Sequence, residues 1–149
     1  MKLTVLPGAI VATLLLAGCS SQHRLAGVWT LDKALERKTI EENAPMGTAA
    51  QVPQNPAVAD DVTISLTSHK ITWMIEAGGG VRYDEYNYTI KKADPHSVAV
   101  SETNTATGAS QDAVYHFETD GDREIMWTSD PVVNKAMGIE LRLYFSRPQ

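Results

Sequence analysis

Apolar and polar residues alternate along most of the second half of the chain. The alternation is regular in residues 62–67, 71–76 and 139–145, where every second residue is aliphatic or aromatic. A period of two places successive side chains on opposite faces of an extended chain, so these segments are predicted to be half-buried β-strands. Similar segments between residues 25 and 145 give about eight strands, joined mostly by short turns.

Glycines and a break in the alternation place two features of the central strands. Residues 77–80, Ala-Gly-Gly-Gly, supply the positive φ angles that a tight reversal between two strands needs. After this reversal Tyr83 falls on one phase of the alternation and Tyr86 on the other. We therefore predict a β-bulge near residues 84–85, which keeps the two tyrosines on the same face.

A further hairpin is predicted around Gly121. A three-residue loop, residues 119–121, with the glycine in the left-handed conformation sets Tyr115 opposite Ile125. A two-residue loop instead sets an apolar residue against an acidic one. The three-residue loop is therefore the expected connection.

Three segments depart from the strand pattern. Asp32 is suited to cap a helix over residues 33–42, a stretch rich in good helix formers. Residues 43–60 contain three prolines and are predicted to form a long surface loop. Residues 130–138 begin with Asp-Pro and end with glycine, which indicates a short helix or helical turn before the last strand.

The order of these elements predicts an all-β fold. An antiparallel, up-and-down barrel of about eight strands, with a short helix after the first strand, is the expected architecture. Pairing the last strand with the first would remove the unpaired edges that invite association. A two-layer β-sandwich satisfies the same alternation and is the alternative.

The first residues have the order of a secretory signal. Lys2 precedes an apolar run, residues 5–16, which ends in Leu-Ala-Gly-Cys at residues 16–19. The run is too short to span a bilayer. The four residues resemble the lipobox of bacterial lipoprotein precursors, and this resemblance implies cleavage after Gly18 and diacylation of Cys19.

The lipoprotein resemblance divides the chain into three parts. Residues 1–18 are expected to be a signal peptide, residues 19–24 a lipidated tether, and residues 25–149 the β-barrel domain. More than one acyl chain holds a protein stably at a membrane, so Cys19 is the expected membrane attachment. Ser20 and Ser21 resemble the sorting residues of outer-membrane lipoproteins, which implies an outer-membrane protein facing the periplasm of a Gram-negative cell.

The predicted first strand carries a second resemblance. Gly27-Val28-Trp29, followed by a helix and a strand meander, resembles the Gly-x-Trp signature of lipocalin-like barrels. The resemblance implies that Trp29 closes one end of the barrel and that an arginine near the end of the last strand, Arg142 or Arg147, packs over its indole. The alternative is that Trp29 is an ordinary core aromatic, and both interpretations bury it.

Composition and motifs narrow the function classes. The chain has 13 Lys and Arg against 18 Asp and Glu, with the basic residues scattered, so nucleic acid is not an expected partner. A single cysteine makes no internal disulfide. The four histidines lack zinc-motif spacing, and neither a nucleophile elbow nor a phosphate-binding loop occurs. We therefore expect no catalytic residue, metal or cofactor.

Two functions from different classes remain. A lipid-anchored binding protein would take a small, largely apolar molecule in its barrel, with Trp73, Tyr83 and Tyr115 as the expected lining. The alternative is a protein-interaction lipoprotein of the envelope: an assembly subunit, or an inhibitor or immunity protein against a periplasmic toxin or hydrolase. An envelope stabiliser without a ligand is a third hypothesis.

Overall fold

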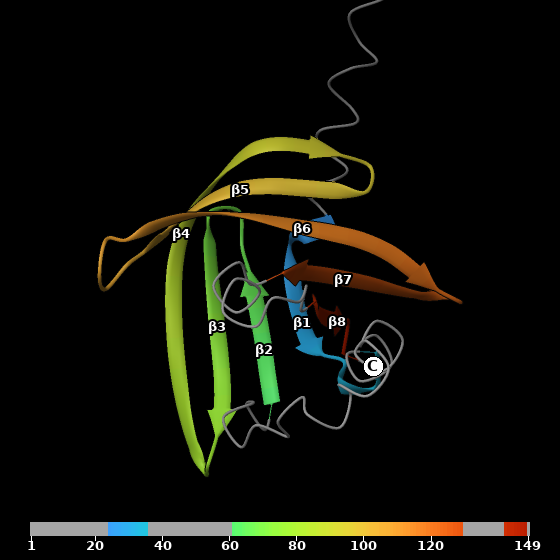
Figure 1. Ribbon diagram of the computed structural model, residues 1–149, viewed down its shortest axis with the longest axis horizontal. Coiled ribbons are helices and arrows are strands. Elements are labelled where there is room, and N and C mark those ends of the chain that lie inside the picture. Colours follow the sequence, from blue (N-terminus) through green and yellow to red (C-terminus); the bar gives the residue numbers. More distant parts are fainter. Residues whose placement is uncertain (1–23, 36–60, 130–141, 149) are drawn as a thin grey trace, which may run out of the picture.

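The structure is a computed structural model that describes residues 24–35, 61–129 and 142–148 of the chain. Within these ranges eight strands close into one antiparallel barrel, in which each strand pairs with its neighbours in sequence and β8 pairs with β1 (Figure 1). The predicted all-β, up-and-down barrel is confirmed, and the β-sandwich alternative is wrong. The strands are β1 (Gly27–Leu31), β2 (Asp61–Leu66), β3 (Lys70–Ala77), β4 (Gly80–Asp94), β5 (Ser97–Asn104), β6 (Ser110–Asp120), β7 (Arg123–Ser129) and β8 (Arg142–Ser146).

A short contact between the first and last strands closes the barrel. Thr30 pairs with Ser146 and Leu31 with Phe145. Directly after β1, the backbone N–H of Asp32 donates to the carbonyl of Tyr144 at 2.7 Å. The contact pairs the two edges that an open sheet would leave free.

Asp32 also begins the helix that follows β1. Its Oδ1 accepts a hydrogen bond from the backbone N–H of Leu35 at 3.2 Å, which is the bond of an N-cap residue. The helix is described from Lys33 to Leu35. The rest of the predicted helix over residues 33–42, the loop over 43–60, the turn over 130–138 and Cys19 lie outside the described residues.

The β3–β4 hairpin has its turn within residues 77–80, where the glycines predict it. Ala77 pairs with Gly80, and the two residues between them, Gly78 and Gly79, have φ angles of 57° and 80°. Two positive φ angles in succession are what a two-residue hairpin turn of type I′ requires.

The predicted bulge near residues 84–85 is wrong. β3 and β4 pair without a shift from Lys70 opposite Asn87 to Ala77 opposite Gly80, and the bulge lies farther on, between Ile90 and Lys92 of β4. Without an earlier bulge, the alternation carries Tyr83 to the outer face.

The β6–β7 hairpin has a shorter loop than predicted. Asp120 pairs with Arg123, so the connection is the two residues between them, and Gly121 has a φ of 62°. A positive φ at the first position of a two-residue turn gives the turn a backbone twist that matches the twist of the two strands, and glycine adopts this φ without strain. This register sets Phe117 opposite Met126, which is fully buried, and turns Trp127 to the outer face.

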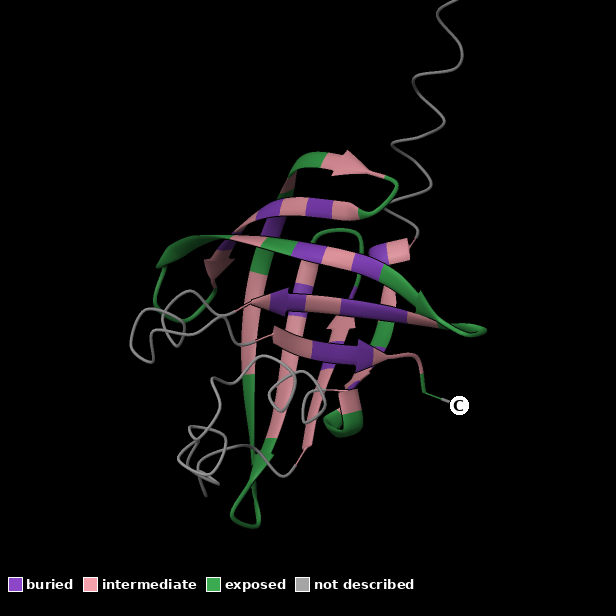
Figure 2. Cartoon of the chain, turned by 45° about the vertical axis from the view of Figure 1, so that its right-hand side comes forward, coloured by how far each residue is buried: buried purple, intermediate pink, exposed green. Residues whose placement is uncertain are grey.

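The core fills the inside of the barrel. Burial is strongest in the middle of the strands and gives way to exposed residues at the tip of the β3–β4 hairpin (Figure 2). The core cluster consists of Leu25, Trp29, Leu31, Ile64, Leu66, Ile71, Tyr88, Val98, Val100, Tyr115, Phe117, Met126 and Phe145.

Successive turns lie at alternate ends of the barrel. The start of β1, the end of β8 and the turns β2–β3, β4–β5 and β6–β7 share one end, which we call the capped end. The β3–β4 and β5–β6 turns lie at the other, which we call the opposite end. In Figure 1 the β3–β4 hairpin points downward, away from the start of β1.

Candidate functional site

Trp29 closes the capped end. Its side chain is fully buried, and its Nε1 donates to the carbonyl of Leu25 at 3.0 Å. The guanidinium of Arg147 lies 3.9 Å from the centre of the indole, and the ring of Phe117 lies 6.1 Å away in a tilted arrangement. The indole is therefore packed on the core side by an aromatic ring and covered by a cation.

Arg147 also holds the chain where it enters the barrel. Its Nη1 donates to the carbonyl of Ala26 at 2.8 Å and its Nη2 to the carbonyl of Arg24 at 2.7 Å. Arg24 in turn lies 4.9 Å from the ring of Phe117 and forms an ion pair of 2.7 Å with Glu124. Two arginines from the two ends of the domain therefore cover the capped end.

Gly27 makes room for this arrangement. Its φ is 122°, a conformation that residues with a side chain rarely adopt. The position that a Cβ would take is occupied by Nη1 of Arg147. The glycine and the tryptophan of the Gly-x-Trp segment thus both contribute to the place of Arg147, the glycine by leaving room for its guanidinium and the tryptophan by lying beneath it.

Of the two arginines expected over Trp29, Arg147 has this place and Arg142 does not. Arg142 lies over the indole of Trp127 instead, 4.3 Å from its centre. The reason is register, since Arg142 is one residue out of phase with the inward-facing Leu143. The prediction for Arg142 is therefore wrong.

Trp127 forms an aromatic cluster on the outer face of β6, β7 and β8. The ring of His116 stacks on it at 3.9 Å with an interplanar angle of 13°, and the ring of Tyr144 lies 6.4 Å away. The cluster fastens three neighbouring strands to one another outside the core.

On five of the strands, an inward-facing apolar residue is less buried than the inward-facing residue next to it toward the capped end. Ile64 and Ile71 are fully buried near the capped end. On β2, β3, β4, β6 and β8, the inward-facing apolar side chain one step nearer the opposite end packs on the core but stays partly exposed. We call this set the apolar ring: Val62, Trp73, Tyr86, Ala113 and Leu143.

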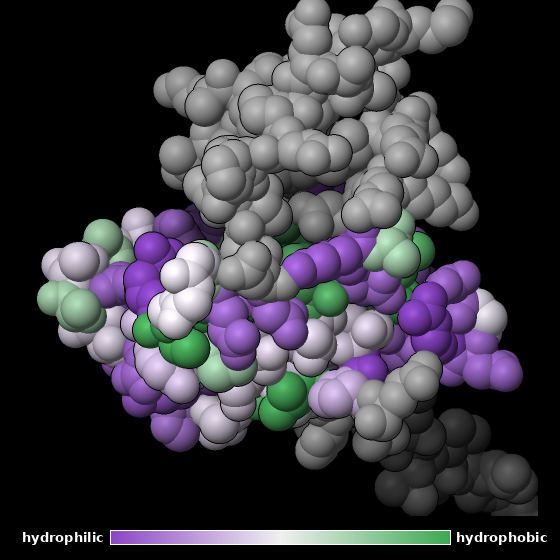
Figure 3. Space-filling model, turned by 90° about the horizontal axis from the view of Figure 1, so that it is seen from below, coloured by the Kyte–Doolittle hydropathy of each residue, from purple (hydrophilic) through white to green (hydrophobic). Residues whose placement is uncertain are grey.

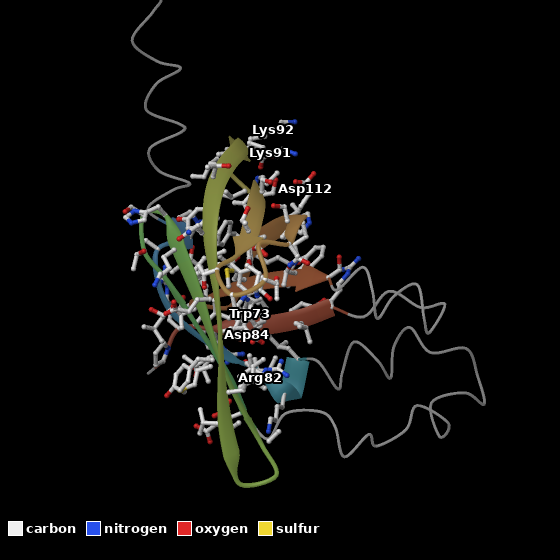
Figure 4. All side chains as sticks on the ribbon, turned by 90° about the vertical axis from the view of Figure 1, so that its left-hand side faces the viewer. Trp73, Arg82, Asp84, Lys91, Lys92 and Asp112 are labelled. Carbon is white, nitrogen blue, oxygen red and sulfur yellow. The ribbon has the colours of Figure 1, made fainter. Side chains whose placement is uncertain are left out.

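Trp73 is the largest side chain of the apolar ring. Its indole meets the ring of Phe145 edge to face at 5.9 Å. Asp84 is its partner on β4 and forms an ion pair of 2.9 Å with Arg82. Figure 4 shows Trp73, Asp84 and Arg82 following one another toward the tip of the hairpin. Viewed from the hairpin side, apolar side chains are exposed among polar ones (Figure 3).

The three residues expected to line the interior have different positions. Trp73 belongs to the apolar ring, and Tyr115 is a core residue with an exposed fraction of 1%. Tyr83 pairs with Met74 on the outer face and is 62% exposed. The prediction that Tyr83 lines the interior is therefore wrong.

Glu102 is an interior group that the sequence analysis missed. It is only 1% exposed, although it is a glutamate. The hydroxyl of Tyr115 donates to its Oε1 at 2.6 Å, and Nε2 of Gln111 donates to its Oε2 at 3.0 Å. A signal was present, because Val98 and Val100 set the inward phase of β5 and Glu102 continues it.

Burial changes the chemistry of the interior tyrosines. It raises the pKa of the Tyr115 hydroxyl well above its usual range, and the charge of Glu102 adds to this effect. Burial also raises the pKa of Tyr88, whose hydroxyl donates to the carbonyl of Thr67 at 2.6 Å. Tyr115 therefore stays a hydrogen-bond donor to Glu102 at physiological pH.

The raised pKa of Tyr115 predicts a loss of stability at high pH. Below about pH 10 this hydroxyl is protonated in both the folded and the unfolded chain, so its contribution is fully present. As the pH rises toward the folded pKa, the unfolded chain loses its proton first, and stability falls by up to about 1.4 kcal/mol per pH unit. Tyr115→Phe is expected to make this decline shallower, as measured by urea unfolding at a series of pH values.

The matched control for this measurement is Tyr83→Phe. It removes a hydroxyl from an exposed outer-face tyrosine and is expected to keep the wild-type slope. Equal slopes for the wild type and Tyr115→Phe would contradict the role given to the buried hydroxyl.

Comparisons with other proteins leave the function to be argued from these residues. Neither a family model, nor a curated protein, nor a solved structure matches the chain. In the part of the chain that the structure describes, no group of three or more His, Cys, Asp or Glu could hold a metal ion. None of the described helices is long and apolar enough to cross a membrane.

Proposed function

We propose that this protein is a lipid-anchored envelope lipoprotein whose barrel binds a small, largely apolar molecule at the opposite end. The observation that carries the proposal is the apolar ring. Side chains from five strands converge on the inner face and remain partly exposed, whereas their neighbours toward the capped end are buried. Binding sites of small molecules are typically lined in this way, by apolar and aromatic groups with a few polar ones.

The energy of binding would come mainly from covering the apolar ring. Removing apolar surface from water contributes about 25 cal/mol per Å². Trp73 offers the largest face, and the neighbouring ion pair of Arg82 and Asp84 provides polar groups at the rim. The proposed role is non-enzymatic and involves neither a cofactor nor a nucleic acid.

Cys19 is the proposed attachment to the outer membrane, with the barrel facing the periplasm. The support is the Leu-Ala-Gly-Cys segment at the end of the apolar run. Mass spectrometry of the protein extracted from bacterial membranes tests this part. The expected mass is that of an acylated chain beginning at Cys19, and an unmodified thiol with the leader attached would contradict it.

Tryptophan fluorescence tests ligand binding. The full chain carrying Cys19→Ser is titrated with a brominated 12-carbon alcohol. The substitution removes the acylation site, so no attached acyl chain competes for the barrel. Bromine quenches a nearby indole, and we expect saturable quenching that is largely lost in Trp73→Phe.

Trp127→Phe is the matched control, because it removes an indole from the outer face. This variant is expected to keep the quenching and its midpoint. Absence of quenching, or quenching that depends on Trp127 instead of Trp73, would contradict the proposal and favour the protein-interaction role.

A further inference from the structure

A buried carboxylate lies directly beneath a polar side chain at the opposite end. Glu102 on β5 pairs with Tyr88 on β4 and with Gln111 on β6. Gln111 is exposed, whereas Glu102 is 1% exposed. The side-chain amide of Gln111 therefore connects the surface with a carboxylate that is otherwise enclosed.

The charge of Glu102 has no cationic partner among the described residues. Its side-chain hydrogen bonds come from a neutral hydroxyl and a neutral amide, those of Tyr115 and Gln111. In every ion pair of the described residues, the lysine or arginine pairs with a carboxylate other than that of Glu102. Arg82, the cation of the β3–β4 hairpin near Trp73, pairs with Asp84 at 2.9 Å.

Burial of an unbalanced carboxylate is costly, and such groups are normally paired with a cation. A carboxylate also has about four acceptor positions, of which the two hydrogen bonds from Tyr115 and Gln111 use two. Glu102 therefore keeps the capacity to accept further hydrogen bonds.

Tyrosines are neighbours of this carboxylate on both adjoining strands. Tyr115 donates to it from β6, Tyr88 is its partner on β4, and Tyr86 is the next residue on the inward phase of β4. An organic cation is attracted both by a carboxylate and by the faces of aromatic rings. Tyr86 also belongs to the apolar ring, so the aromatic and the acidic groups are continuous.

We propose that the ligand is an amphiphilic amine whose ammonium group binds Glu102 and whose apolar part covers Trp73 and Tyr86. The inference rests on the proposed function and specifies the class of molecule bound. The ammonium displaces the amide of Gln111 and donates to Glu102 in its place. A neutral donor is thereby exchanged for a charged one, and the buried negative charge gains its counterion.

Three 12-carbon probes with different headgroups test the inference on the full chain carrying Cys19→Ser. Dodecylammonium, 1-dodecanol and dodecanoate compete with the brominated alcohol, each below its micelle-forming concentration. We expect the ammonium to bind about tenfold or more tightly than the alcohol, and dodecanoate to bind most weakly. Equal or weaker binding of the ammonium would overturn the proposal.

Two variants assign the preference to the carboxylate. Glu102→Gln is expected to remove the preference for the ammonium and to keep the affinity for the alcohol. Gln111→Ala removes the covering amide without changing Glu102, and is expected to strengthen ammonium binding only. If Glu102→Gln does not fold, the proposal is tested by the wild-type preference for the ammonium and by whether Gln111→Ala strengthens ammonium binding.

Glu118→Gln is the control for the charge of the outer surface, since Glu118 is exposed on β6. It is expected to keep the wild-type preference. Ammonium preference that survives Glu102→Gln would overturn the proposal. Alcohol binding without any preference would overturn only the cation specificity, whereas failure of every probe to bind would overturn the proposed function as well.

Discussion

Replacing Trp29 with alanine is expected to lower the free energy of unfolding by about 3–5 kcal/mol, the usual cost of removing a large buried aromatic side chain. The indole is fully buried, packs near Phe117 and carries the guanidinium of Arg147. Its loss leaves a cavity and also removes the surface on which the arginine rests. Urea unfolding followed by circular dichroism measures the change.

Trp127→Ala is the matched control for this prediction. Trp127 is also covered by an arginine, Arg142 at 4.3 Å, but it lies on the outer face and is only partly buried. Its replacement is expected to cost less than half as much as that of Trp29. Equal losses would show that the capped end has no special part in the stability of the barrel.

Gly27→Ala is expected to be nearly as destabilising, by about 2–4 kcal/mol. The residue would have to hold a φ of 122°, and its Cβ would displace Nη1 of Arg147. The displaced guanidinium would lose its hydrogen bonds to the carbonyls of Ala26 and Arg24. The same unfolding measurement gives the loss.

Gly108→Ala shows what a side chain at a positive φ costs where there is no collision. Gly108 also has a positive φ, 71°, but a Cβ there would meet no atom within 4 Å. The loss of stability in Gly108→Ala therefore reports backbone strain without a steric clash. In a double-mutant cycle, Gly27→Ala is expected to cost less when Arg147 is already alanine, and strict additivity would contradict the steric account.

The sequence alone predicts the barrel well because its signal is repeated. Each strand needs only the period-two alternation, and the same pattern recurs along the chain, so one misplaced turn does not alter the fold class. Trp29 was predictable for a different reason. The Gly-x-Trp segment resembles a signature of lipocalin-like barrels, and that resemblance implied an arginine over the indole, which the structure identifies as Arg147.

The failed predictions concern phase, which a single residue can reverse. Moving the bulge of β4 from residues 84–85 to the stretch after Ile90 transfers Tyr83 from the inner to the outer face. Shortening the turn at Gly121 likewise changes the register of β7, which places Met126 on the inner face and Trp127 on the outer face. Local sequence fixes such choices weakly, because the burial of the whole face decides between them.

Glu102 was missed because a charged residue is expected to face the solvent. It faces inward because Val98 and Val100, on the same phase of β5, are fully buried. Hydrogen bonds from Tyr115 and Gln111 make this position tolerable. A lone acidic residue on the apolar phase of a strand is thus the kind of signal that locates an interior polar group.

If Cys19 is acylated as proposed, the path of the chain into the barrel determines how the domain is oriented at the membrane. Arg147 binds the carbonyls of Arg24 and Ala26, so both termini of the folded domain meet at the capped end. A five-residue leash from Cys19 to Arg24 reaches at most about 18 Å. Under the proposed acylation, the capped end would lie close to the lipid headgroups and Trp73 would face away from the membrane, so a ligand would enter from the aqueous compartment.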